Sequence, residues 1–290
     1  MSDRVEAYLS FVRSRHQAWE MRQLGLEPPW SDDPIVQRRK FTNVFRVLDH
    51  GTQWWLTQLA PTATRRTDQL YLALFYRFTN STDGWDEYKR RWGGYPHLDD
   101  DAATVGQRFV EIQRNGPKVF SGAYMSRGWT GEDKAMTYAR LCHELAQGIA
   151  LDYELAESQK ERFEILLAPY GMGKFMAMQV LTDLGYLRGA DEDEFIVAGP
   201  GAVKGCASVF PGVGPEEGIY SAQRLVHEEL PQVGLDLPDG TRRLPSLMDI
   251  QNTFCEYSKY VRYRERPLPA HPYFPAHQAE EPTYPQHWAN

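Results

Sequence analysis

The fold is decided by one stretch near the middle of the chain, Leu166-Leu167-Ala168-Pro169-Tyr170-Gly171-Met172-Gly173-Lys174-Phe175-Met176-Ala177. Its pattern is that of a helix, a tight Gly-x-Gly turn and a second helix. The two glycines permit a sharp reversal of the chain and close approach of another backbone. The second helix begins at the turn, so its free N–H groups and its positive end point outward there, where they can bind a phosphate. A plain helix connection that happens to contain two glycines is the alternative interpretation.

Lys174 adds a cation beside these N–H groups, so the turn has the features needed to hold a nucleic-acid backbone. Helix-hairpin-helix proteins grip the sugar-phosphate backbone of DNA with a turn of this kind. Gly171, Gly173 and Lys174 are therefore the candidate DNA-binding residues. The sequence predicts an all-α fold with a helix-hairpin-helix element at 170–174.

Apolar residues recur at helical spacing on both sides of the turn. Between 186 and 218 the many glycines, acids and prolines predict an ordered loop with short helices, and a minor strand pair near 194–210 is the exception we consider. One domain is expected over 1–265, followed by a Pro-rich extended tail over 266–290. Helices are expected over 3–24, 51–60, 66–79, 86–91, 101–114, 131–150, 158–167, 174–185, 219–230 and 246–262.

The composition is that of an ordinary globular protein, with 290 residues, 42% hydrophobic and 24% charged. The net charge of −7 does not indicate nucleic-acid binding, although a basic face can lie on an acidic protein. Three cysteines without a close pair argue against a zinc site or a disulfide framework, and no metal cluster is expected. The chain lacks a signal-peptide pattern and any apolar run of roughly 20 residues. We therefore expect a cytoplasmic protein without a membrane partner.

A basic and aromatic segment near the start carries the first candidate site: Arg38-Arg39-Lys40-Phe41-Thr42-Asn43-Val44-Phe45-Arg46-Val47-Leu48-Asp49. On a helix, Arg39, Asn43, Arg46 and, less closely, Asp49 would share one face. Such a face can be a solvated surface. It can also be a site in which guanidinium groups hold phosphate oxygens and a carboxylate positions or deprotonates a nucleophile.

A second segment, Leu74-Phe75-Tyr76-Arg77-Phe78-Thr79-Asn80, repeats the combination of an arginine and a Thr-Asn pair among aromatic residues. Buried arginine is costly unless it is paired. Arg46 and Arg77 are therefore expected to have partners, either structural acids (Asp49 is one candidate) or a bound anion. Asp183, nine residues after Lys174, can serve a reaction or merely cap a helix. In the helix over 246–262, Glu256 and Lys259 can pair, and a solvated face with a salt bridge is the simpler interpretation.

Base-excising glycosylases with this hairpin usually carry a catalytic Asp in the strand-like stretch after the second helix. In this chain that stretch is 195–201, and Gly199-Pro200-Gly201 stands where the acid would be. The substitution argues against ordinary base excision. Lys204 follows the Gly-Pro-Gly turn and can also face an anion.

Together these segments resemble the alpha-glutamyl/putrescinyl thymine pyrophosphorylases linked to phages, also described as amino acid:DNA transferases. The matching segments span most of residues 38–262 and are together much more specific than any one of them. They are 41–49, 75–80, the Gly-Met-Gly turn with Gln179 through Asp183, Gly199-Pro200-Gly201, and Cys255-Glu256-Tyr257-Ser258-Lys259-Tyr260.

The resemblance implies a helical fold similar to helix-hairpin-helix DNA glycosylases. It implies that the substrate is double-stranded DNA with a 5-hydroxymethyluracil that carries pyrophosphate. An amine, from an amino acid such as glycine or from putrescine, would replace the pyrophosphate, and base flipping is compatible with this reaction. No cofactor is implied, and Mg²⁺ bound to the pyrophosphate is compatible with the chemistry.

The reaction must hold the leaving charge, supply an unprotonated amine and expose the base. Arg46 and Arg77, with Lys204, suit the first task, and Asp49 or Asp183 suits the second. The other substrate- or phosphate-binding candidates are Asn43, Asn80, Gln179, Gly199, Gly201, Glu256 and Lys259. Two other functions stay open: a DNA glycosylase for a modified or damaged base, and a non-catalytic DNA-binding subunit of a base-modification complex.

Overall fold

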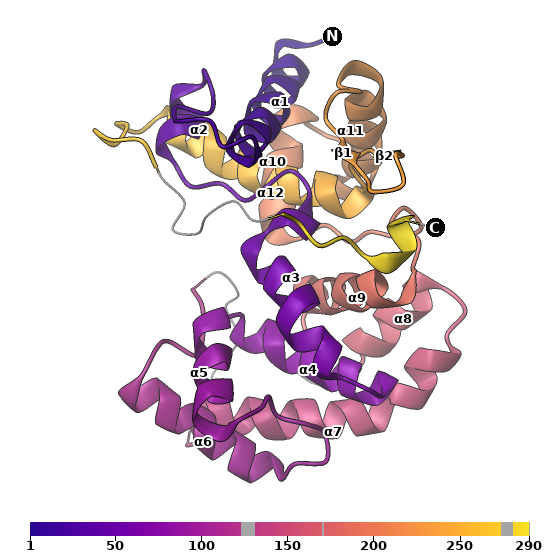
Figure 1. Cartoon of the computed structure of the whole chain (residues 1–290). Coiled ribbons are helices and arrows are strands. Elements are labelled where there is room, and N and C mark those ends of the chain that lie inside the picture. Colours follow the sequence, from indigo (N-terminus) through magenta and orange to yellow (C-terminus); the bar gives the residue numbers. More distant parts are fainter. Residues whose placement is uncertain (123–130, 170, 274–280, 290) are drawn as a thin grey trace. The chain divides into compact units, whose positions relative to one another are not determined.

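A computed structural model of the chain describes residues 1–122, 131–169, 171–273 and 281–289 (Figure 1). Within these residues the structure is mostly helical. Its regular strands are the short antiparallel pair β1 (Leu235–Asp236) and β2 (Arg242–Arg243). The chain clusters into two compact units: unit 1 comprises Met1–Asp49 and Glu192–Asn290, and unit 2 comprises His50–Asp191.

Unit 1 is built around α12 (Leu247–Arg264), which packs against α1, α10 and α11. Aromatic rings fill the core: Tyr8 stacks on Phe254 at 4.7 Å between centroids, and Phe11 lies 4.9 Å from Tyr260. Ser246 and Asp249 form a capping box that fixes the start of α12. The other helices of this unit are α1 (Asp3–Gln23), α2 (Pro34–Arg38), η1 (Arg46–Leu48), α10 (Pro200–Val209), α11 (Pro215–Glu229) and η4 (Gln286–Ala289).

Unit 2 is built around α4 (Arg66–Thr79), in which every side chain from Leu70 to Thr79 is buried. This helix packs against α7 and α9, and the rings of Phe75 and Phe109 lie 5.0 Å apart. The helix ends at Asn80, whose left-handed φ of 47° closes its last turn. The other helices of this unit are α3 (His50–Trp54), the π-helical η2 (Trp55–Leu59), η3 (Ala60–Thr62), α5 (Thr82–Trp92), α6 (Ala102–Asn115), α7 (Lys134–Leu155), α8 (Gln159–Leu167) and α9 (Lys174–Arg188).

The all-α prediction is confirmed, and the helices expected from hydrophobic spacing appear within a few residues of their predicted bounds. One local prediction is wrong: the segment 39–45 is a loop between α2 and η1, so Arg39, Asn43 and Arg46 do not share one helical face. Helix α10 over 200–209 agrees with the short helices expected within 186–218, and the described residues 194–210 contain no strand pair. The sequence also predicted one domain over 1–265 and an extended tail over 266–290. The chain clusters instead into the two units above, and the tail includes η4, with Trp288 8% exposed.

Helix α10 packs on α12 through glycines that leave no room for a side chain. A Cβ at Gly205 would lie 2.0 Å from the carbonyl oxygen of Phe254, and a Cβ at Gly201 would lie 2.4 Å from the sulfur of Cys255. The Gly-Pro-Gly segment therefore has a structural reason to exist: proline begins the helix and glycine allows close packing.

Gly205→Ala is expected to lower the free energy of unfolding by about 3 kcal/mol, the upper end of overpacking costs, because the obstructing atom is backbone. Gly148→Ala is the matched control, because its Cβ would meet nothing within 4 Å in the helix α7. Alanine favours helix over glycine by about 1 kcal/mol, so the control is expected to stabilise. Chemical denaturation of both variants checks the pair, and equal stabilities would contradict the packing argument.

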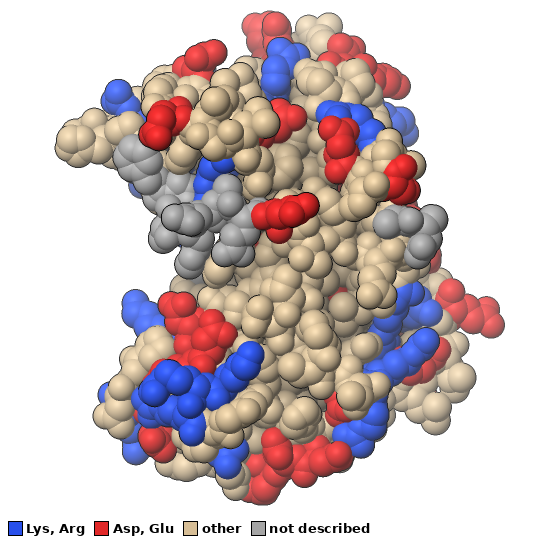
Figure 2. Space-filling model, viewed as in Figure 1, with Lys and Arg blue, Asp and Glu red and all other residues tan. Residues whose placement is uncertain are grey.

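The surface view in Figure 2 shows acidic and basic side chains intermingled on the face drawn. Around α5, Arg90 and Arg91 pair with Glu87, and Arg91 also pairs with Glu111. Arg90 and Arg91 are thus paired with acids locally. Contact with a polyanion through α5 would require breaking these pairs.

Candidate functional site

The loop 39–45 in unit 1 is held by side chains instead of helical hydrogen bonds. The N–H of Thr42 donates to Glu256 at 3.2 Å, and the N–H of Asn43 donates to Asp49 at 2.9 Å. The side chain of Asn252 donates to the Asn43 carbonyl at 3.0 Å. Because these acceptors and donors satisfy the backbone, the segment that periodicity assigned to a helix is stable as a loop.

Arg15 of α1 joins this loop from the other side. Its guanidinium donates to the Thr42 carbonyl at 2.8 Å and to the side-chain oxygen of Asn43 at 2.5 Å. The ammonium of Lys259 lies 2.5 Å from Glu256. We call this set of residues the Asp49 cluster: Arg15, Thr42, Asn43, Asp49, Asn252, Glu256 and Lys259.

The cluster sets the protonation of its acids and bases. Burial, together with the nearby Glu256, raises the pKa of Asp49 to about 7, although the hydrogen bond from Asn43 and the charges of Arg46 and Arg15 act to lower it. Burial lowers the pKa of Arg15 to about 10, so that it stays charged near neutral pH. Burial also opposes the charge of Lys259, but Glu256 raises the pKa of that ammonium overall. A carboxyl that titrates near neutral pH beside two cations is suited to accept a proton.

Arg46 lies in the same unit, 3% exposed, and its N–H donates to Asp249 at 2.7 Å. Asp249 also accepts from Ser246, and burial raises its pKa. A further acid, Glu192, lies 2.8 Å from Arg243, and burial raises its pKa to about 7. Arg46 is buried as expected. Its backbone N–H donates to Asp249, and its guanidinium charge lowers the pKa of Asp49, the partner expected from the sequence.

Arg77 and Asp183 form a buried pair within unit 2. Two guanidinium nitrogens donate to the two carboxylate oxygens of Asp183, one of them at 2.7 Å, and a third donates to Asn80 at 3.1 Å. The side chains are 3% and 0% exposed. This bidentate geometry holds α4 against α9. The expectation of a structural acid for Arg77 is confirmed, and that acid is Asp183.

The Gly-x-Gly turn joins α8 and α9, and these helices pack on each other. Gly171 has a φ of 95°, which glycine tolerates, and Gly173 precedes α9 without a side-chain cap. Gly171, Gly173 and Lys174 are exposed. The sharp turn and the uncapped helix start are thus present. Tyr170 of the predicted motif lies outside the described residues.

The remaining candidates fall on α9 and α10. Gln179 is 3% exposed on α9, and Lys204 is exposed on α10. The N–H of Gly199 donates to Gln251 at 3.1 Å, and Gly201 packs on Cys255. Both glycines therefore already contact α12.

Sequence reasoning did not identify Arg15 or Asn252 as members of the site. The missed signal was spacing: Arg15 follows the buried Tyr8, Phe11 and Val12 at helical intervals, so it had to face inward. A charged residue on the inward face of a helix needs partners.

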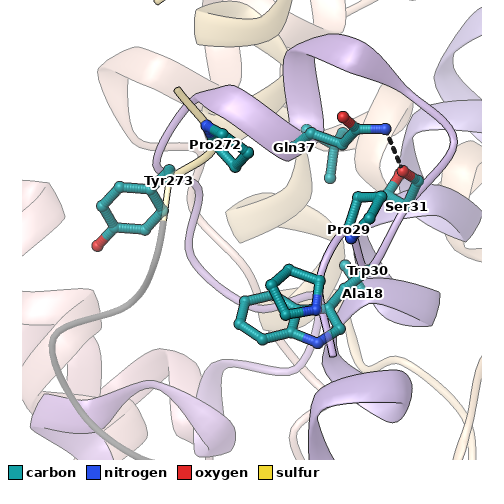
Figure 3. Close-up of a pocket in the computed structure, with 9 residues that line it drawn as sticks. Ala18, Pro29, Trp30, Ser31, Gln37, Pro272 and Tyr273 are labelled. Carbon is teal, nitrogen blue, oxygen red and sulfur yellow. Dashed lines mark hydrogen bonds between the residues drawn. The ribbon is translucent and has the colours of Figure 1, made fainter. Parts of the chain in front are cut away.

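The structure also limits other kinds of site. Among the described residues, no group of three or more His, Cys, Asp or Glu side chains is placed to hold a metal ion. None of the described helices combines the length and apolar character needed to cross a membrane. A cavity of about 30 Å³ in unit 1, beside Trp30 and Pro272, has room for about one water (Figure 3). Gln37 donates to the Ser31 carbonyl beside it at 2.6 Å.

Comparison with known proteins relates the chain to phage DNA modification. The family described as 5-hmdU DNA kinase, helical domain, matches residues 2–268. A 5-hmdU DNA kinase of Bacillus phage SP10 is 26% identical over 292 aligned positions, which cover 89% of this chain and 45% of that relative. The chain thus spans less than half of the relative's length. No solved structure matches it.

Proposed function

The chain belongs to the 5-hmdU DNA kinase helical-domain family, and from this we infer that it acts on DNA that contains 5-hydroxymethyluracil or a base made from it. The family match and the phage relative support an assignment to the phage enzymes that modify thymine, without specifying which reaction of that group is catalysed. The pyrophosphorylase activity that the motifs implied is a finer statement and is part of this proposal.

The observation that carries the proposal is Asp49, a carboxyl with a pKa near 7 whose charge interacts with Arg46 and Arg15. A base of this strength takes a proton from a nucleophile at neutral pH. The cations beside it offset negative charge that develops on a phosphate leaving group. Asp183 is less suited to this role, because both of its carboxylate oxygens already accept from Arg77.

The proposed reaction replaces pyrophosphate by an amine. The nitrogen lone pair attacks the methylene carbon, a C–N bond forms, and the C–O bond to pyrophosphate breaks with its electron pair leaving on oxygen. The proton lost by the nitrogen passes to Asp49. Arg15, Arg46 and Lys259 supply positive charge in the same unit, and any Mg²⁺ would arrive with the pyrophosphate.

Mass spectrometry of digested DNA tests the reaction. DNA with the pyrophosphorylated base is incubated with the chain and either glycine or putrescine, with Mg²⁺ or EDTA, and then digested to nucleosides. A nucleoside with the mass of the amine adduct is expected. No new mass with any amino acid or polyamine would overturn the proposal, and abasic sites would indicate a glycosylase instead.

A second candidate function is base presentation to a kinase. The relative named as a kinase is more than twice as long as the matched region, and this sequence contains no GxxxxGK[ST] phosphate-binding loop. In this role the chain would bind DNA that contains 5-hydroxymethyluracil without modifying the base itself. Tighter binding to that DNA than to thymine DNA, together with no adduct in the assay above, would favour this role.

The turn before α9 provides the proposed contact with the DNA backbone. Lys174→Gln is expected to weaken binding to DNA of any sequence. The slope of the logarithm of the binding constant against the logarithm of the salt concentration is expected to become less steep by about one, as for the loss of one phosphate contact. Lys160→Gln is the matched control, because Lys160 is an exposed lysine on the neighbouring α8. Fluorescence anisotropy across a salt series checks both variants. An equal effect of the two substitutions would contradict a specific role for the turn.

A further inference from the structure

Unit 2 contains a polar pocket far along α9 from the Gly-x-Gly turn. Its volume is about 220 Å³. The helices α4, α7, α8 and α9 all contribute to it. The lining residues are Arg66, Tyr153, Glu154, Gln159, Arg162, Leu184, Gly185, Arg188, Gly189 and Ala190.

Three arginines line this pocket, and two of them pair with its one carboxylate. Glu154 receives Arg66 at 2.6 Å on one oxygen and Arg188 at 2.5 Å on the other. Arg162 donates to the Ala156 carbonyl at 2.9 Å. Glu154 is the acid that lines the pocket, so the lining carries three positive charges against one negative charge.

The side chain of Arg188 is largely enclosed, with 14% of it exposed, whereas that of Arg66 is 71% exposed. It lies 5.1 Å from the centre of the Tyr153 ring, and its Nε is buried without a hydrogen-bond partner in the described structure. Burial lowers the pKa of this guanidinium, a cost that a bound anion would reduce. The arrangement thus leaves positive charge in excess at an enclosed place.

The helix ends around the pocket do not favour a charge of either sign. Helices α4 and α8 begin there, at Arg66 and Gln159, and helix starts are positive. Helix α9 ends there, which is unfavourable, but the Gly185 carbonyl is already engaged by the N–H groups of Gly189 and Ala190. Helix α7 also ends there, at Leu155, so two positive ends oppose two negative ends, and the preference for an anion depends on the arginine side chains.

The volume limits what can enter. It is smaller than the roughly 300–1,000 Å³ of pockets that enclose drug-sized ligands and corresponds to about seven waters at ~30 Å³ each. A phosphate group with part of the molecule that carries it suits this space. Two excess positive charges match a terminal phosphate or a pyrophosphate better than a singly charged phosphodiester of the DNA backbone.

We propose that this pocket of unit 2 is a binding site for a terminal phosphate group or pyrophosphate, with Arg66, Arg162 and Arg188 as its ligands. The site is separate from the Asp49 cluster, which belongs to unit 1, and the proposal does not rest on the reaction proposed above. Its test needs no modified DNA, so its failure is distinguishable from failure of that reaction.

Calorimetric titration of the full chain with inorganic pyrophosphate at constant ionic strength tests the site. Binding is expected, and Arg162→Gln and Arg66→Gln are each expected to weaken it about tenfold, as for loss of one charged hydrogen bond. Arg66 has its side chain 71% exposed, so that variant is expected to fold normally. Arg140→Gln is the matched control, because Arg140 is exposed on α7 and pairs with Glu132 at 2.8 Å.

No measurable binding of pyrophosphate, or equal binding by both pocket variants and the control, would overturn the proposal. A duplex with 5′-hydroxyl ends serves as the second ligand in competition. If this duplex, which lacks terminal phosphates, displaces pyrophosphate and binds less well to Arg162→Gln, the pocket takes backbone phosphate and the assignment to terminal phosphate is wrong.

Discussion

Asp49→Asn is expected to reduce formation of the modified nucleoside by about 10²–10⁴-fold, the usual loss when a general base is removed. The asparagine has the same shape, and its oxygen can still accept from the N–H of Asn43. Only the capacity to take a proton is lost. Rate measurements by nucleoside mass spectrometry check the result. Asp32→Asn, at an exposed acid of the same unit, is the matched control and is expected to leave the rate unchanged.

The pH dependence of the reaction has a defined sign. Asp49 accepts a proton only when ionised, and its pKa lies at about 7. At a constant concentration of unprotonated amine, the wild-type rate is therefore expected to rise through pH 7 and to level off above it. A rate that does not change between pH 6 and 8 (about one pH step on either side of that pKa) would argue against Asp49 as the base.

The same substitution separates catalysis from stability. The pKa of Asp49 is raised from 3.8 to about 7 in the folded chain, so the folded chain binds this proton more tightly than the unfolded chain. Ionised Asp49 therefore lowers the free energy of unfolding as the pH rises through that interval. At pH 8 the Asn variant is expected to unfold at the same temperature as the wild type or higher. Unfolding at a clearly lower temperature would indicate a structural role instead.

Arg77→Met is expected to lower the free energy of unfolding by about 3–5 kcal/mol, because it leaves the carboxylate of Asp183 buried without its cation. Both oxygens of Asp183 accept from Arg77, and the carboxylate is 0% exposed. Arg90→Met breaks an exposed pair with Glu87 and is expected to cost at most about 1 kcal/mol. Denaturant unfolding of the two variants compares these costs.

The double variant Arg77→Met/Asp183→Leu distinguishes a structural pair from catalytic residues. Replacing both charges by apolar groups is expected to recover most of the lost stability. If the refolded double variant keeps its activity, Arg77 and Asp183 act by holding α4 against α9. If it is stable and inactive, the sequence prediction of a catalytic role for these two residues is supported.

Hydrophobic spacing was sufficient to predict most helices, because a helix that buries one face leaves a regular pattern. The uniformly buried α4 was also predicted, since Leu70, Leu74 and Phe78 recur at helical spacing. The pattern failed at 39–45, where Glu256, Asp49 and Asn252 satisfy the backbone. Two of these three partners lie more than 200 positions away, so no local window contains the cause.

The candidate site could be predicted only in part, because the partners of its residues also lie far away in the sequence. Arg77 was expected to need an acid, but Asp183 is 106 positions away and only the fold pairs them. Asn43, Asp49 and Glu256 were named from their types, yet their grouping with Arg15 required α1 and α12 to pack. The glycines at 199 and 201 were assigned to phosphate binding, while their neighbours on α12 give them a packing role that composition does not reveal.

The insertion of unit 2 between the two halves of unit 1 has a consequence for the order in which the chain folds during synthesis. Unit 2 is continuous, so it can fold as it leaves the ribosome. The loop at Asn43 must wait for Asn252, which lies 209 positions later. At roughly 5–20 residues per second, that wait is about 10–40 s. The chain therefore completes the surroundings of its candidate base only when α12 emerges, after the whole of unit 2.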